Sequence, residues 1–207
     1  QIDHLVYPRF TRTVSPHRLS KTPFGNEAFD LIRNNSVRDD QIIRDVSECI
    51  AAGRTPVVLT KFVDHAERLY LRLEEYADKV ILLTGKNGSK VRKIQVEEMY
   101  QVDQAESLIV VGTGSLLGEG FDFPRLDTLF MATPVSGENV VEQYVGRLNR
   151  DYDGKEKVIV YDYVDSHIRE FDKMFSSRMK AYKKIGYEIC TGLKDQKQET
   201  NAIFDVD

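Results

Sequence analysis

The sequence predicts an α/β fold, a doubly wound and mostly parallel sheet of about five or six strands with helices on both faces. Two observations support this prediction. Several short segments are continuous runs of apolar residues, which is typical of parallel strands buried on both faces. Segments with helical spacing of apolar residues stand between these runs, so right-handed crossovers would join neighbouring parallel strands.

The composition is that of an ordinary globular protein. The chain has 207 residues, of which 41% are hydrophobic and 30% charged, and it is long enough to bury a core. A net charge of −4 provides no general attraction for nucleic acid, so any such contact would be local. No apolar run approaches membrane-spanning length and no signal-peptide pattern is present. The first residue, Gln1, is not Met, which suggests a fragment or a processed start.

The N-terminal region, residues 1–39, is expected to be an irregular extension or linker, with a candidate strand in the apolar stretch at 4–13. Pro16, Pro23 and Gly25 interrupt any regular pattern after it. The main domain is expected over 40–187, and a polar tail over 188–207. A helix is predicted to begin at Asp40 and to end at Gly53.

Five apolar runs in the main domain are predicted strands, at 57–60, 80–83, 108–111, 128–131 and 158–161. A helix with a capping box, Asp64-x-x-Glu67, should follow the first run. Further helices are indicated by apolar positions at 91–99, 140–148 and 168–182. The link from Val111 to Thr128 has no clear helix and is rich in glycine, which is where a functional loop is expected.

Two segments combine residues that suit a nucleotide. In the glycine-rich segment 112–122, glycines permit close backbone approach, and Asp122 offers a carboxylate for a ribose hydroxyl. The alternative is a turn in which Asp122 caps the local backbone. Arg147 and Arg150 are three residues apart, which places both guanidinium groups on one face of a helix and suits a polyphosphate. The alternative here is a surface pair in solvent. Both segments follow strands and should reach the same carboxyl edge of the sheet.

Together these segments resemble the second RecA-like domain of superfamily 2 helicases and translocases. Residues 113–122, which include Gly118-Glu119-Gly120-Phe121-Asp122, are similar to the motif V of that superfamily. Gln143-x-x-Gly146-Arg147-x-x-Arg150 is similar to its motif VI, and residues 57–60 with the following helix resemble its motif IV. The resemblance covers roughly residues 40–187. The sequence Glu119-Gly120-Phe121-Asp122 is closer to that of DEAH-like, restriction-enzyme-subunit and repair-helicase proteins than to that of DEAD-box RNA proteins. DNA is therefore favoured over RNA as the partner.

The resemblance implies roles for individual residues. Arg147 and Arg150 would contact the γ-phosphate of ATP, and Gln143 would face the nucleotide or brace the arginines. Residues expected beside the nucleotide are Glu119, Gly120, Asp122 and Gly146. Residues expected to contact the nucleic-acid backbone are Thr113, Gly114, Thr60 and Gly85.

Two elements of a complete nucleotide hydrolase are missing. The chain has no G-x-x-x-x-G-K-S/T segment, and the loop at 84–90 has the wrong spacing. It also has no DE-x-H/D segment to position Mg²⁺. In the superfamily both belong to the first RecA-like domain. We therefore expect ATP with Mg²⁺ to be held mainly by an N-terminal RecA-like domain of the same polypeptide, and we expect this chain alone to be inactive.

Other residue types indicate no further site. The histidines have no metal spacing, and His65 is expected on a helix surface. Cys49 and Cys190 are expected to be free thiols in a reducing, cytoplasmic compartment. A solvated helix face is predicted for the basic cluster Lys173, Arg178, Lys180, Lys183 and Lys184.

Two other classes of function are alternatives to a motor domain. A non-catalytic nucleic-acid-binding or scaffolding module could retain the fold, but it has no use for paired γ-phosphate sensors. A Rossmann-like transferase would need G-x-G-x-x-G after its first strand, whereas the first strand here runs into Lys61-Phe62-Val63.

Overall fold

The computed structural model describes residues 2–16, 22–117 and 121–190, and these form a sheet of seven parallel strands. The strand order is β3-β4-β2-β5-β6-β1-β7, and the fold class predicted from the sequence is confirmed. The strands are β1 (Asp3–Phe10), β2 (Pro56–Thr60), β3 (Lys79–Leu83), β4 (Leu108–Thr113), β5 (Thr128–Met131), β6 (Lys157–Val164) and β7 (Glu188–Ile189).

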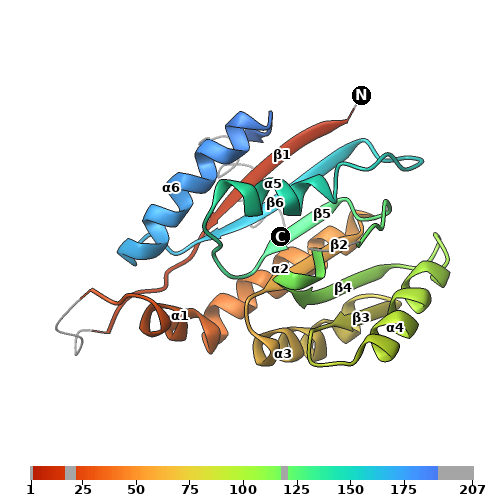
Figure 1. The fold of residues 1–207 in the computed structure, drawn as a ribbon, viewed down its shortest axis with the longest axis horizontal. Helices are drawn as coiled ribbons and strands as arrows, with labels where there is room; N and C mark the ends of the chain where they lie inside the picture. The colour runs from red at the N-terminus through yellow and green to blue at the C-terminus, as the bar shows by residue number, and fades with distance from the viewer. Residues whose placement is uncertain (1, 17–21, 118–120, 191–207) are drawn as a thin grey trace, which may run out of the picture.

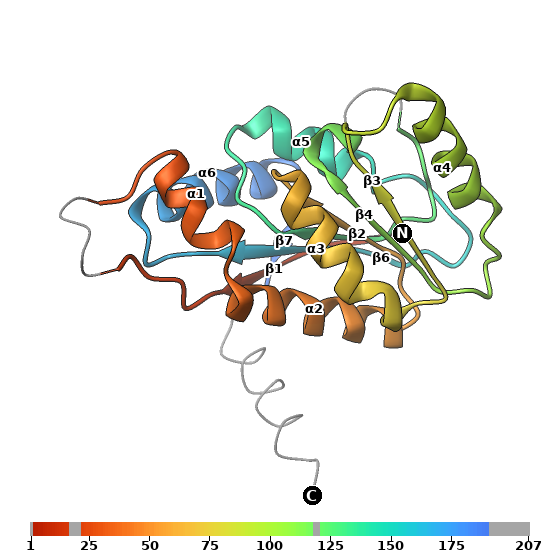
Figure 2. The ribbon, with the colours of Figure 1, turned by 90° about the horizontal axis from the view of Figure 1, so that it is seen from below.

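Helices cover both faces of this sheet (Figures 1 and 2). The elements α2 (Ser36–Ala51) and α3 (Val63–Leu73) lie on one face, and α4 (Ser89–Gln101), α5 (Glu138–Gly146) and α6 (Arg169–Lys184) lie on the other. A short helix, α1 (Asn26–Arg33), packs against the beginning of α6. Two short 3₁₀ turns complete the set, η1 (Glu74–Tyr76) and η2 (Gly114–Leu117).

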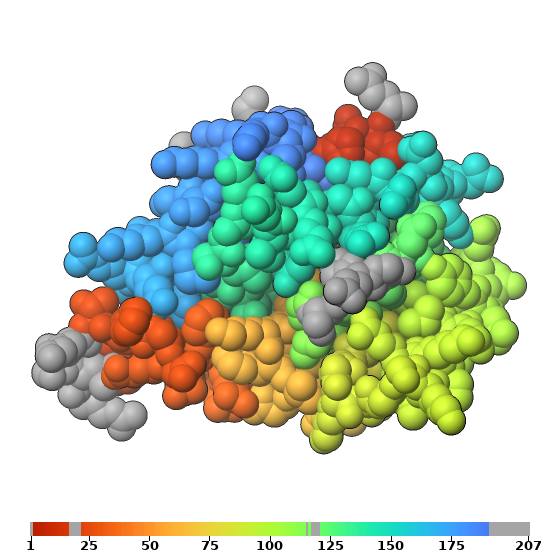
Figure 3. All heavy atoms as spheres, viewed as in Figure 1, coloured from red at the N-terminus to blue at the C-terminus, as the bar shows by residue number. Residues whose placement is uncertain are grey.

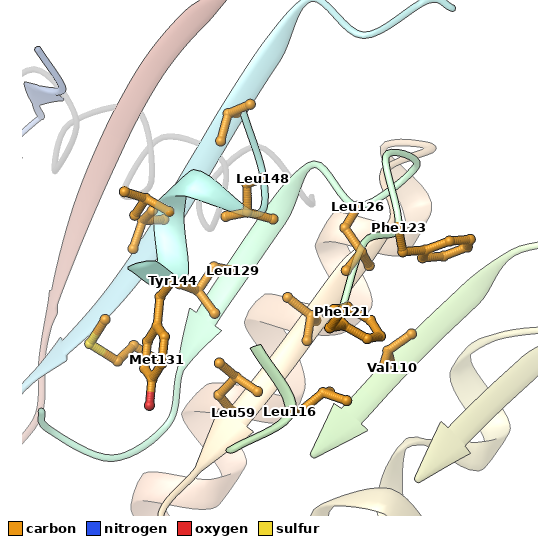
Figure 4. Packing of buried hydrophobic residues seen from close by; sticks show 14 of the residues in the cluster. Leu59, Val110, Leu116, Phe121, Phe123, Leu126, Leu129, Met131, Tyr144 and Leu148 are labelled. Carbon is orange, nitrogen blue, oxygen red and sulfur yellow. The ribbon is translucent and has the colours of Figure 1, made fainter. Parts of the chain in front are cut away.

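The strands read as continuous apolar runs because successive residues enter two different cores. Val57 and Leu59 point into the core under α4, α5 and α6, whereas Val58 points into the core under α2 and α3. The glycine-rich segment contributes Phe121 to the first of these cores, where it lies near Val110 of β4 (Figure 4). The segment therefore takes the place of a crossover helix between β4 and β5.

The N-terminal region is more regular than the sequence predicted. β1 pairs along its whole length with β6, so the candidate strand is confirmed and belongs to the sheet. Helix α1 was not predicted, and α2 begins at Ser36 instead of Asp40. Asn35 caps α2 by accepting a hydrogen bond from the backbone N–H of Arg38 at 3.0 Å.

Two helices differ in detail from their predicted patterns. The predicted capping box at the start of α3 is wrong, because the helix already begins at Val63. The Asp64 carboxylate instead accepts hydrogen bonds from Arg33 and from the backbone N–H of His65. In α4 only Met99 is buried, whereas Val91 and Ile94 are exposed.

The predicted solvated basic face of α6 is wrong for Arg178. Its guanidinium group is 1% exposed and donates two hydrogen bonds of 2.8 Å to the carboxylate of Asp162 on β6. It also donates to the carbonyl of Val135 at 2.9 Å, and the hydroxyl of Tyr182 donates to Asp162 at 2.7 Å. A buried charge is tolerated only with partners of this kind.

Candidate functional site: a pocket and an arginine turn

A pocket of about 660 Å³ opens at the carboxyl edge of the sheet. It is lined by all four residues that the sequence placed on a nucleic-acid track: Thr60, Gly85, Thr113 and Gly114. Thr60 ends β2, Thr113 ends β4, and Gly85 follows β3, so three parallel strands deliver these residues to one edge. The apolar part of the lining includes Val140 and Tyr144 from α5 and Phe29 from α1.

Two glycines allow neighbouring groups to approach the backbone closely at this edge. A Cβ at Gly112 would lie 2.6 Å from the carbonyl oxygen of Leu83 and 2.8 Å from Cδ2 of Leu116, so no larger residue fits without displacing backbone. A Cβ at Gly114 would overlap the hydroxyl group of Tyr144. Tyr144 extends from α5 along Met131 toward this end of the sheet (Figure 4). The glycines therefore let the segment after β4 pass closely under α5.

Asp122 and Arg150 lie together, although neither lines the pocket. The Arg150 Nε lies 3.5 Å from the Asp122 carboxylate, and the two side chains are 54% and 53% exposed. Helix α5 starts at the carboxyl edge and runs back over the sheet, so its C-terminal end lies away from the pocket (Figure 1). The expectation that the arginines reach the carboxyl edge together with Thr113 is therefore wrong. The glycine-rich segment and the arginine turn nevertheless meet, through Asp122 and Arg150.

The two arginines do not share a helical face, because α5 ends at Gly146. Arg147 is the C-cap residue and is half-buried, and Arg150 follows in the turn after the helix. Gln143 and Gly146 are exposed on the last turns of α5. Glu119 and Gly120 lie outside the residues that the structure describes. In Figure 3, α5 lies between α6 and α4 on this face of the molecule.

Lys155 ties the arginine turn to Pro124, just after the glycine-rich segment. Its ammonium group donates to the carbonyls of Leu148 at 2.5 Å, Arg150 at 2.8 Å and Pro124 at 3.1 Å. Burial lowers the pKa of Lys155, although the nearby charges of Asp127 and Asp151 act in the opposite direction. No sequence pattern indicates a role for this residue, because its three acceptors are backbone carbonyls brought together by folding.

His65 is fully buried, and its expected place on a helix surface is wrong. Its Nε2 lies 2.8 Å from the Asp39 carboxylate, and its Nδ1 lies 2.7 Å from the Thr60 hydroxyl. Burial alone would raise the pKa of Asp39, but hydrogen bonds and charges from His65 and Arg68 hold it below its usual value. An ionised carboxylate only accepts, so Nε2 carries the proton, and the neutral ring accepts from Thr60 through Nδ1.

This burial should make the stability of the chain depend on the protonation of His65. Burial lowers the pKa of the imidazole in the folded state, although Asp39 opposes the shift. Between that lowered pKa and the ordinary value of about 6.5, the unfolded chain binds more protons, so the free energy of unfolding decreases as pH falls. We expect a slope of at most about 1.4 kcal/mol per pH unit from this group.

Urea unfolding between pH 7.5 and 5 would measure this slope in three proteins. His65→Gln should be less stable at neutral pH but should lack the histidine contribution to the slope. His167→Gln, at an exposed histidine, should keep the wild-type slope. Equal slopes in the wild-type chain and His65→Gln would contradict this assignment.

No group of three or more metal-binding side chains occurs in the described part of the chain. Neither Cys49 nor Cys190 forms a disulfide bond within the described residues, as expected. Burial raises the pKa of Cys49 to about 12, which makes it unreactive. Within the described ranges, no helix is long and apolar enough to cross a membrane.

Similar proteins were found among viral sequences, whereas no family model matches the chain. Putative helicase 161L of Invertebrate iridescent virus 6 is 38% identical over 78 residues, which cover 38% of this chain and 16% of that protein. Transcript termination protein A18 of Fowlpox virus is 28% identical over 148 residues, covering 71% and 30%. Uncharacterized protein 108L of Invertebrate iridescent virus 3 is 37% identical over 91 residues, covering 43% and 81%.

Several solved structures have the same fold. T4 UvsW has a TM-score of 0.68 at 18% identity, covering 89% of this chain and 40% of that one. The C-terminal domain of the DEAD-box protein Dbp5 has a TM-score of 0.57 at 14% identity, covering 91% and 88%. Domain 2 of the DEAD-box helicase Mss116p, solved with an RNA duplex, has a TM-score of 0.54 at 14% identity, covering 78% and 62%.

The chain has the fold of the second, C-terminal RecA-like domains of superfamily 2 helicases. It belongs to the same family as the viral protein 108L, most of whose length it covers. It spans only 16% of the putative helicase and 30% of the transcript termination protein that it matches.

Proposed function

We propose that the chain is the second motor domain of an ATP-dependent nucleic-acid helicase or translocase. In this role it supplies arginine fingers and part of the nucleic-acid track, and a first RecA-like domain of the same polypeptide holds most of the ATP and Mg²⁺. The relatives named as helicase and transcript termination proteins support this proposal. Dbp5 of S. cerevisiae, solved with RNA and ADP BeF3, has a TM-score of 0.62 to this chain at 13% identity.

The observation that carries the proposal is the half-exposed Arg150 beside Asp122. The buried arginines of this fold have a structural explanation, since Arg38 and Arg178 are 2% and 1% exposed and are paired with Asp165 and Asp162. An ion pair as exposed as Arg150–Asp122 adds little stability. Lys155 nevertheless fixes the backbone around it with three hydrogen bonds. A rigid turn that presents an accessible guanidinium group suits a phosphate brought by another domain.

The proposed roles follow from this placement. Arg150 and Arg147 would contact the γ-phosphate, with Gln143 and Gly146 beside them on the end of α5. Asp122, with Glu119 and Gly120 of the same segment, would lie near the ribose. ATP with Mg²⁺ would supply a phosphoryl group for transfer to water, and this chain would stabilise its developing negative charge.

The pocket at the carboxyl edge is the proposed contact with the nucleic-acid backbone. Thr113, Gly114, Thr60 and Gly85 line it, and hydroxyl groups and backbone amides are common phosphate ligands. The sequence Glu119-Gly120-Phe121-Asp122 in the glycine-rich segment favours DNA over RNA as the partner. The cleft between the two motor domains would close on ATP and open after hydrolysis, which would change the contacts with the nucleic-acid strand.

A reducing intracellular compartment is the proposed location.

The purified chain should not hydrolyse ATP, with or without single-stranded DNA, because the phosphate-binding loop and the residues that hold Mg²⁺ would lie in the other domain. Phosphate release measures this directly. The Arg150→Ala variant, purified identically, is the control for contaminating ATPases. Turnover by the wild-type chain that Arg150→Ala abolishes would contradict the division of the site between two domains.

A further inference from the structure

Lys61 is a cation at the pocket that belongs to none of the predicted motifs. It directly follows Thr60 at the end of β2, its side chain is exposed, and it lines the pocket. Its Nζ lies 4.2 Å from the ring centroid of Phe29 on α1 and 5.9 Å from that of Phe62. The two rings, themselves in edge-to-face contact, therefore hold the ammonium group at one side of the pocket.

The charge of Lys61 is not neutralised within the described residues. No carboxylate there lies within ion-pair distance of its Nζ. Glu170 also lines the pocket, but its carboxylate accepts a hydrogen bond of 2.7 Å from the backbone N–H of Gly25. By contrast Lys86, in the loop after β3, lies 3.4 Å from the Glu67 carboxylate.

The backbone at Lys61 is also fixed. Its N–H donates to the hydroxyl of Thr133 at 2.8 Å, and Thr133 lines the same pocket. A lysine whose backbone and ammonium group are both held in place loses less conformational entropy when it binds an anion. Thr113 lines the same pocket, and the combination of a cation with a hydroxyl group is typical of sites for backbone phosphates.

We propose that Lys61 binds a backbone phosphate of the nucleic-acid strand, and that α1 is part of this site because Phe29 positions the lysine. The inference rests on the proposed function and adds to it the charged residue of the track. The chain has a net charge of −4, so a local cation of this kind must supply the attraction that the whole surface does not. Contacts to phosphate carry no sequence information, so binding should be insensitive to base sequence.

The salt dependence of binding tests this inference. Fluorescence anisotropy with a labelled oligo(dT) of about ten nucleotides would give dissociation constants from low to moderate KCl. Lys61→Met should reduce the magnitude of the slope of log K against log salt by about 0.7, the value for one phosphate contact on a single strand. At 0.1 M salt this corresponds to binding about fivefold weaker. Lys61→Arg keeps the charge and should keep the slope.

Two further variants separate charge from position. Lys86→Met removes an exposed lysine at the same edge that is already paired with Glu67, and it should leave the slope unchanged. Phe29→Leu keeps an apolar side chain against Phe171 but removes the ring under Lys61, so it should weaken binding while the slope stays closer to wild type than in Lys61→Met. Thermal unfolding of each variant confirms that it is folded.

The outcomes distinguish this inference from the proposed function. If Lys61→Met is folded and binds with the wild-type affinity and slope, the assignment of Lys61 is overturned, while the motor domain and its pocket remain. If the wild-type chain binds no oligonucleotide at low salt, the nucleic-acid track itself is wrong, and both proposals fail at this pocket. A loss of slope in Lys86→Met equal to that in Lys61→Met would also overturn the assignment, because the effect would then be unspecific.

Discussion

Replacing Arg150 by Ala in the intact protein is expected to reduce nucleic-acid-stimulated ATP hydrolysis by about 10³–10⁵-fold, the range found for arginine fingers in other nucleotide hydrolases. The guanidinium group is half-exposed beside Asp122 on a turn that Lys155 fixes in place. It can therefore meet the γ-phosphate without a rearrangement of its own backbone. Steady-state phosphate release with saturating single-stranded DNA measures the loss.

The same variant should leave folding and nucleic-acid binding nearly unchanged. An ion pair with half-exposed partners contributes about 0–1 kcal/mol, and Arg150 does not line the pocket. Arg150→Lys keeps the charge but loses the planar fork, so its activity should fall between wild type and Arg150→Ala. Arg44→Ala, at an exposed arginine of α2 on the opposite face of the sheet, is the matched control and should retain full activity. Normal hydrolysis with lost binding would reverse the proposed assignment.

Replacing Asp162 by Asn is expected to destabilise the chain by about 3–5 kcal/mol, the usual cost of removing one partner from a buried ion pair. The carboxylate is fully buried and accepts two hydrogen bonds from Arg178 and one from Tyr182. The amide leaves the guanidinium group buried without a compensating charge. Because Arg178 also holds the carbonyl of Val135, which lines the pocket, the loop after β5 should loosen as well.

Urea unfolding at neutral pH measures the loss of stability. Asp40→Asn is the matched control, since Asp40 forms an exposed ion pair with Arg72 and should cost about 0–1 kcal/mol. A change below about 1 kcal/mol for Asp162→Asn would show that the Asp162–Arg178 pair does not stabilise the fold.

The central sheet was predictable because burial on both faces leaves an unambiguous pattern. The runs at 57–60, 108–111 and 128–131 have no polar side chain before their last positions except Thr128, and each forms a strand within one or two residues of its predicted bounds. Helix α1 was missed because it has only eight residues and follows Pro23 and Gly25, whose local signal favours a turn. Its stability comes from packing against Ile168 and Phe171, which the local sequence cannot reveal.

The candidate site was predictable in part. The residues that line the pocket follow from parallel strands ending at one edge, which topology alone dictates. The predicted place of Arg150 on the helix was wrong. The helical spacing of apolar residues continues through Leu148, but α5 ends at Gly146, a residue with low helix propensity. The sequence could not reveal the roles of Lys61, His65 and Lys155, because each role depends on contacts with residues of other elements.

The position of β1 has a consequence for how the chain folds. β1 lies between β6 and β7, so the first strand finds both of its neighbours among the last elements of the sequence. Contacts of such large sequence separation slow folding, because loop closure must be achieved before they form. Until β6 and β7 are available, β1 has no strand partner, and an unpaired strand of this kind favours aggregation.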